Sequence, residues 1–93
     1  MQNLNLEEVL VSDNFSGCMA KLNVNIRQET GLDCAGDYVT FSCTGTFVRK
    51  DLAYLMFNQA NMAMALGLRV SIKIDDSRKH GGFCFDNRVD VIK

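Results

Sequence analysis

The most strongly patterned stretch of the chain is apolar and runs from Lys50 to Gly67. Apolar residues recur there at helical spacing, no proline interrupts them, and Gly67 can take the left-handed conformation that ends a helix. The polar residues between Tyr54 and Leu66 are uncharged amides, so the predicted helix lacks the charged outer face of an ordinary surface helix. Such a helix is either buried on both sides within one chain or packed against a second subunit on one side.

The second arrangement is favoured, because a chain of 93 residues has little material to cover both sides of this helix. Large uncovered apolar surfaces usually mark interfaces. We expect Phe57, Asn61 and Met64, which lie on one side of the helix, to face a partner subunit. The residues predicted to face the sheet are Leu52, Leu55, Met56, Ala60 and Ala63.

Alternation of apolar and polar residues predicts strands before and after the helix. The predicted strands are residues 18–26, 38–44, a short segment at 46–48, 68–75 and 83–92. Residues 1–17 are predicted to form an N-terminal arm or a short strand, and residues 29–37 a loop. The order β-β-β-α-β-β is that of the OB-fold, so we expect a mostly β, five-stranded, partly open barrel with one central helix.

All 93 residues are expected to form one domain with a single core. The strand alternation and the helical stripe together select the side chains that should be buried. The predicted core consists of Leu22, Val24, Ile26, Val39, Phe41, Leu55, Val70, Ile72 and Val89.

The helix KDLAYLMFNQANMAMALG is followed by LRVSIKID, a polar loop and FCFDNRVDVI. This layout resembles the B subunits of five-subunit bacterial toxins of the cholera and subtilase-cytotoxin type, from Cys18 to Ile92. The resemblance implies an OB-fold whose long helix meets the helices of neighbouring subunits in a ring. It is a likeness of architecture and transfers no sugar-binding residue to this chain.

The four cysteines, Cys18, Cys34, Cys43 and Cys84, are widely spaced and show no metal-binding or dithiol motif. An even number in a short chain is compatible with two disulfides and an oxidising compartment. The alternative is four buried thiols, and three disulfide connectivities remain open. A Cys34–Cys43 bridge would require the chain to fold back, and Gly36 is where that turn is expected.

Composition narrows the possible functions and compartments. The chain is 47% hydrophobic and 23% charged, with a net charge of −1, and no block of like charge suggests a nucleic-acid or anionic-membrane surface. The apolar stretches are too short to span a bilayer, and the N-terminus does not read as a signal peptide. A cytoplasmic location follows if Met1 is the natural start. Secretion or a periplasmic location follows if Met1 was added to a mature form and the cysteines are bridged.

The segment DDSRKHGG holds the densest group of polar side chains: Asp75, Asp76, Arg78, Lys79 and His80. One interpretation is a small site for a sugar, a phosphate or a metal ion, with carboxylate oxygens as ligands. The favoured interpretation is a solvated hairpin loop, so we expect no metal site and no cofactor. A nucleophilic Cys84 paired with His80 is conceivable, but no catalytic triad can be assembled around this single histidine, and we expect a non-enzymatic protein.

Four aromatic residues could form a stacking platform for sugars or bases, namely Tyr38, Phe41, Phe83 and Phe85. The alternation of the strand from residue 38 places Phe41 in the core instead. The acidic balance of the chain argues against a polyanionic ligand, so nucleic acid is not expected.

Two functions from different classes remain open. The first is a binding module that forms a homo-oligomer through its apolar helix and recognises a glycan or a protein partner with its loops. The second is a small cytosolic regulatory or inhibitory protein of a mobile element. Disulfides favour the first.

Overall fold

The computed structural model describes residues 1–13 and 17–93, so part of the predicted arm of residues 1–17 lies outside the described residues. The fold is mostly β, with one long helix, as predicted. The elements in chain order are β1 (Leu6–Val11), β2 (Cys18–Leu22), α1 (Ile26–Thr30), β3 (Tyr38–Thr40), α2 (Lys50–Leu66), β4 (Arg69–His80) and β5 (Phe83–Ile92).

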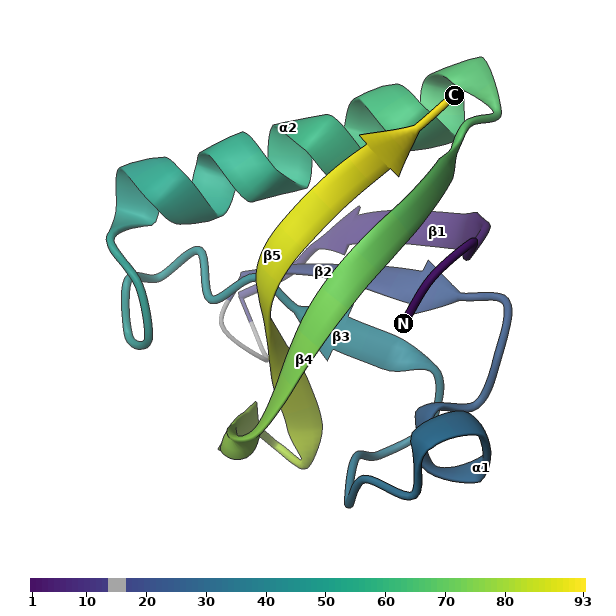
Figure 1. Ribbon diagram of the computed structural model, residues 1–93. Coiled ribbons are helices and arrows are strands. Elements are labelled where there is room, and N and C mark those ends of the chain that lie inside the picture. Colours follow the sequence, from purple (N-terminus) through teal and green to yellow (C-terminus); the bar gives the residue numbers. More distant parts are fainter. Residues whose placement is uncertain (14–16) are drawn as a thin grey trace.

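The five strands form one mixed sheet in the order β1-β2-β3-β5-β4 (Figure 1). Neighbouring strands are antiparallel except β3 and β5, which run parallel and meet at Thr40 and Phe85. The sheet does not close, but the residues before β1 reach its far edge. Leu4 exchanges two backbone hydrogen bonds of 2.8 Å with Val70 of β4, and Met1 exchanges two with Ile72.

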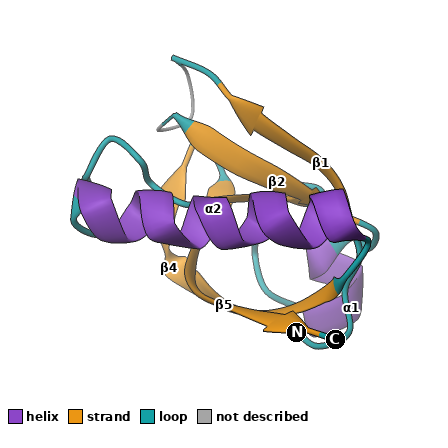
Figure 2. Cartoon of the chain, turned by 90° about the horizontal axis from the view of Figure 1, so that it is seen from above, coloured by secondary structure: helices purple, strands orange, loops and turns teal. Residues whose placement is uncertain are grey.

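The helix α2 lies across the sheet, between the β1–β2 side and the β4–β5 side (Figure 2). Its buried residues are Ala53, Met56, Phe57, Ala60 and Ala63. The three alanines let the helix approach the strands closely, and Phe57 meets Phe41 edge to face, with ring centroids 5.6 Å apart. Gly67 ends the helix in the left-handed conformation, as expected.

The chain between β2 and β3 differs from the prediction, because a short helix replaces the end of a strand. The strand predicted for residues 18–26 ends at Leu22, and α1 begins at Ile26. The side chain of Asn25 accepts a hydrogen bond from the amide of Gln28, and Gly31 ends the helix in the left-handed conformation. These two caps outweigh the strand-like alternation of Val24 and Ile26.

The predicted short strand at residues 46–48 is wrong, since these residues form a bend. The fifth strand of the sheet is β1 instead, in the segment predicted as an arm or short strand. The second predicted strand also ends early, at Thr40, because Ser42 adopts a positive φ of 58°. Strand β4 in turn continues through the predicted polar loop to His80, which leaves Gly81 and Gly82 as the hairpin turn.

Seven of the nine predicted core residues are buried. The exceptions are Val24, which is partly buried, and Leu55, which is 60% exposed. Leu52 is also exposed, so the predicted sheet-facing stripe is wrong at these two positions. The helix is rotated so that Ala53 and the large ring of Phe57 enter the core in their place.

The four cysteines form two disulfides, Cys18–Cys43 and Cys34–Cys84, with Cα atoms 5.7 Å and 5.4 Å apart. The Cys34–Cys43 bridge considered from the sequence does not form. Cys18–Cys43 ties β2 to the segment before α2, and Cys34–Cys84 ties the α1–β3 connection to β5. In so small a domain such cross-links commonly supplement a limited core, and they fit an oxidising compartment.

Truncating Phe41 tests the register of this core. Phe41→Ala should lower the free energy of unfolding by about 3–5 kcal/mol, because it removes a buried aromatic ring and leaves a cavity against Phe57. Urea unfolding followed by circular dichroism measures the change. Tyr54→Ala on the exposed side of α2 is the control and should change stability by less than about 0.5 kcal/mol. Equal losses in both variants would contradict this packing.

The disulfide pairing predicts the thiol content. The denatured protein should show no titratable thiol without reductant and four after reduction, because no described cysteine is free. Non-reducing proteolysis and mass spectrometry should recover the 18–43 and 34–84 peptide pairs. Any free thiol in the untreated protein, or a peptide linking Cys34 to Cys43, would rule out this connectivity.

Candidate functional site

Most of the polar side chains of residues 75–80 make hydrogen bonds and ion pairs with other groups of the same chain. The carboxylate of Asp75 accepts hydrogen bonds from the amide and hydroxyl of Ser77 and lies 2.7 Å from Nε of Arg78. These hydrogen bonds, those of Ser77 foremost, lower the pKa of Asp75 to about 2. Arg78 also donates to the backbone oxygen of Phe47 and lies over the ring of Phe85.

The remaining side chains of this segment point to different neighbours. Lys79 reaches Asp33 in the α1–β3 connection at 3.3 Å, and its hydrogen bond is the main cause that lowers the pKa of Asp33. His80 stacks on Phe47 with ring centroids 4.3 Å apart, while Asp76 is exposed. The segment is therefore an irregular stretch of β4 whose side chains contact other parts of the chain in several directions. No group of three or more metal-binding side chains occurs among the described residues.

The one histidine approaches a serine, not a cysteine. Nε2 of His80 lies 3.3 Å from Oγ of Ser42, and the same oxygen accepts a hydrogen bond from the amide of Phe47. Ser42 is fully buried, so this contact stabilises the turn before α2 and presents no accessible nucleophile. Cys84, the nucleophile considered from the sequence, is bonded to Cys34.

An apolar groove lies on the face of the sheet where β1, β2, β3 and the start of β5 meet. Leu10, Ser12, Met19, Tyr38 and Phe83 line it, and its volume is about 280 Å³. Small-molecule pockets begin at roughly this size, about 300 Å³. Met19 is buried beneath the groove, whereas the rings of Tyr38 and Phe83 are half-buried and meet edge to face at 6.0 Å.

Charged side chains lie next to Tyr38, one of the residues that line this groove. The hydroxyl of Tyr38 donates a hydrogen bond to Oε1 of Glu8 at 3.1 Å, and this bond is the main cause that raises the pKa of Tyr38. Lys21, which pairs with Tyr38 across the strands, lies 3.8 Å from Glu7 and 3.9 Å from Asp37. The groove thus combines an apolar floor, two aromatic rings and a polar rim with both signs of charge.

Two of the four aromatic residues considered as a stacking platform lie in this groove. Tyr38 and Phe83 are half-buried and line it, whereas Phe41 and Phe85 are buried in the core. The strand alternation predicted the buried position of Phe41. The position of Phe83 next to Tyr38 depends on the parallel pairing of β3 with β5, which no sequence pattern reveals.

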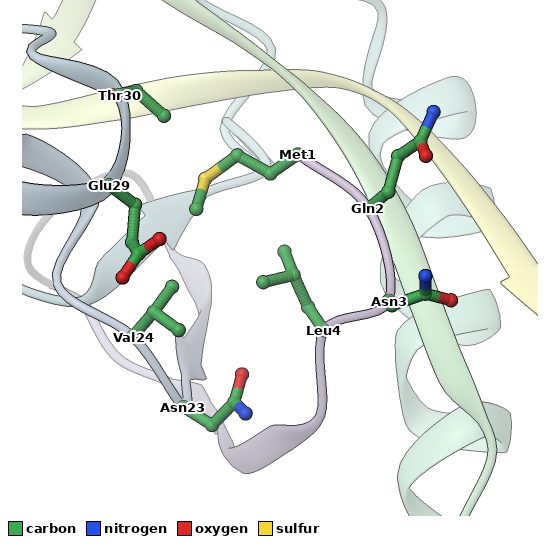
Figure 3. Close-up of a pocket in the computed structure, with 8 residues that line it drawn as sticks. All are labelled: Met1, Gln2, Asn3, Leu4, Asn23, Val24, Glu29 and Thr30. Atoms are coloured by element: carbon green, nitrogen blue, oxygen red, sulfur yellow. The ribbon is translucent and has the colours of Figure 1, made fainter.

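A second pocket, of about 320 Å³, lies between the N-terminal segment and α1 (Figure 3). The side chains of Met1, Leu4, Val24 and Glu29 point into it, while that of Asn3 points away. It offers a single carboxylate and no aromatic ring. The groove at Tyr38 and Phe83 therefore has the more varied chemistry for orienting a ligand.

The residues predicted to face a partner subunit do not share one environment. Phe57 is buried against Phe41, Asn61 is partly buried, and Met64 is exposed. The most exposed apolar side chains of α2 are instead Leu55 and Leu66. The face of the helix that remains uncovered is therefore centred away from Phe57.

The core contains one carboxylate without sufficient partners. Asp86 is fully buried in β5, and its Oδ1 accepts a hydrogen bond from the amide of Arg88. Oδ2 has no hydrogen-bond partner. Burial raises the pKa of Asp86 well above its usual 3.8, because the ionised form loses its hydration.

Comparisons of the chain with protein-family models, with curated proteins and with solved structures give no match. No helix among the described residues is long and apolar enough to cross a membrane.

Asp86→Asn should change how stability depends on pH. The pKa of Asp86 is higher in the folded state, so its contribution to stability is fully present below about pH 3.8 and is lost as the pH rises through the folded-state pKa. The amide of the variant does not titrate, so the variant should lack the fall in the free energy of unfolding that the parent shows as the pH rises. Urea unfolding at several pH values between about 4 and 8 measures how the free energy of unfolding of the variant differs from that of the parent.

His80 acts in the opposite direction, because burial lowers its pKa from 6.5 and its contribution is lost as the pH falls below that value. Subtracting the parent curve from the Asp86→Asn curve at each pH cancels this contribution. Parallel curves for the two proteins would show that Asp86 does not titrate differently on folding.

Proposed function

We propose that this protein is a non-enzymatic binding module that recognises a glycan in the groove at Tyr38 and Phe83. The observation that carries the proposal is the pair of half-buried aromatic rings beside an apolar floor and a polar rim. The C–H face of a sugar ring packs against the electron-rich face of an aromatic ring. Glu8, Lys21 and Asp37 at the rim supply acceptors and donors for sugar hydroxyls.

We also propose an OB-like fold, although its element order differs from the one predicted. In its support, the sheet order β1-β2-β3-β5-β4 is joined at its ends by the pairing of Leu4 with Val70, and α2 falls between β3 and β4. OB-folds bind oligosaccharides and oligonucleotides on the face of their second and third strands. The groove is lined by Met19 of β2 and Tyr38 of β3, on that face.

Charge favours a glycan over a nucleic acid. The net charge of the chain is −1, Glu8 accepts a hydrogen bond from Tyr38 of the groove, and Lys21 lies near Glu7 and Asp37. A polyanion bound there would meet these carboxylates and release few counterions. A neutral sugar avoids this repulsion.

The module is further proposed to assemble through the outer face of α2, as the resemblance to toxin B subunits implies. Among residues 1–13 and 17–93, seven large apolar side chains are exposed, and six of them belong to this helix. The two disulfides favour a secreted or periplasmic protein over the cytosolic regulator considered from the sequence.

Screening the oxidised protein on an array of immobilised mono- and oligosaccharides tests the proposal, and isothermal titration with the best hit gives its affinity. Phe83→Ala should weaken binding by about tenfold or more, because a stacking contact contributes roughly 1–3 kcal/mol. Tyr38→Phe keeps the ring and loses the hydroxyl, so it should retain most of the affinity.

Tyr54→Ala is the matched control, since Tyr54 is an exposed aromatic residue outside the groove. Its affinity should equal that of the parent protein. Absence of any sugar ligand, or equal losses in Phe83→Ala and Tyr54→Ala, would remove the groove as a glycan site. Capture of a protein by the same face would replace the glycan with a protein ligand.

A further inference from the structure

The outer face of α2 carries a heptad pattern. Leu52, Leu55, Gln59, Met62 and Leu66 follow one another at separations of three, four, three and four residues. This is the spacing of the a and d positions with which two helices pack as a coiled coil. The four apolar members are 40%, 60%, 48% and 65% exposed, so the sheet uses none of them fully. We call these five residues the α2 seam.

The seam lies apart from the side of α2 that packs on the sheet. The core side is formed by Ala53, Met56, Phe57, Ala60 and Ala63. Their burial accounts for the fold without help from the seam. The apolar character of Leu55 and Leu66, the two most exposed residues of α2 among the large apolar ones, therefore has no explanation within one chain.

The surface beside the seam is already hollowed. A depression of about 460 Å³ is lined by Leu52, Leu55, Met56, Asn58, Gln59 and Met62. These six residues make two adjoining sets of the form i, i+3, i+4, i+7, namely 52-55-56-59 and 55-58-59-62. Such a set of four is the hole that receives one side chain, or knob, of a facing helix in a coiled coil.

The charge pattern favours a second copy of this chain as the partner that covers the α2 seam. No charged residue lies between Asp51 and Arg69, so two identical helices meet without like-charge repulsion. A helix that lies on a lipid surface carries lysine or arginine along its polar face, which this helix lacks between those two positions. Two copies of Gln59 in register can satisfy each other by hydrogen bonding, whereas an entirely apolar partner would leave the amide unpaired.

We propose that α2 packs against α2 of a second copy through the seam, with Gln59 as the polar position that sets the register. This inference rests on the assembly part of the proposed function and names its contact. It places Leu55 and Met62, and not Phe57, Asn61 and Met64, at the centre of the interface. A single polar residue at such a position costs stability but specifies the pairing.

Sedimentation equilibrium of the oxidised full chain over roughly 1–100 μM tests the seam. The parent protein should associate, and Leu55→Glu should raise its dissociation constant by at least tenfold, because an unpaired carboxylate would be buried in the interface. Met64→Glu is the matched control, on the same helix but off the seam, and should associate like the parent. Circular dichroism should be unchanged in both variants, since both residues are exposed in the single chain.

Gln59→Leu supplies a test that does not depend on disruption. It should tighten association by about tenfold and broaden the distribution of oligomer sizes, because the residue that fixes the register is lost. Weaker association in this variant would overturn the role given to Gln59.

Dissociation of Met64→Glu together with an intact Leu55→Glu assembly would overturn the seam and move the interface to the side of Met64. A parent protein that remains at 10.4 kDa throughout would overturn assembly through α2 altogether. Sugar binding by the same samples is measured separately, so failure of the glycan proposal is distinguishable from failure of the seam.

Discussion

The packing of one side of α2 on the sheet is the contact on which the rest of this structure depends. Ala53, Ala60 and Ala63 bring the helix close to the strands, and Phe57 fills the space above Phe41. The helix crosses the sheet and contacts β1 and β2 near one edge and β4 and β5 near the other. Because the sheet can cover only this side, the same contact leaves the outer side of the helix open to water and to a partner.

The disulfide Cys34–Cys84 fixes the connection between α1 and β3 to the core. Cys34–Cys84 joins the α1–β3 connection to β5, and the backbone amide of Ala35 donates to the carbonyl of Gly82 nearby. The start of β5 is thereby held beside β3, where Phe83 meets Tyr38. The groove is therefore built on strands and a disulfide, which hold a binding geometry more firmly than free loops do.

The polar segment of residues 75–80 makes its contacts within the chain. Asp75 pairs with Arg78 inside this segment, and Lys79 pairs with Asp33 in the α1–β3 connection. The proposed groove instead uses ordinary strand residues that carry no motif. Such a site arises when strands distant in the sequence become neighbours, as Tyr38 and Phe83 do.

Local patterns in the sequence sufficed for α2 and for β5, and for the first half of β4. The helix was expected from Lys50 to Gly67 and spans Lys50–Leu66, because its spacing and its terminal glycine are both local signals. Most of the core was predicted by the same patterns. The even number of cysteines indicated two disulfides. The caps of α1, at Asn25 and Gly31, are local as well, but the alternation up to Ile26 led to the prediction of a strand there.

Only the tertiary structure decided which strands pair, which cysteines join and which side of α2 is covered. The parallel contact of β3 with β5 and the pairing of Leu4 with Val70 link residues far apart in the chain, so no local pattern specifies them. A helix that is apolar on nearly every side can pack through several faces. Its periodicity alone predicted that Leu55, and not Phe57, would face the sheet. In the structure Phe57 is buried and Leu55 is exposed, because the ring of Phe57 fits against Phe41 while the other side of the helix lies beyond the reach of the strands.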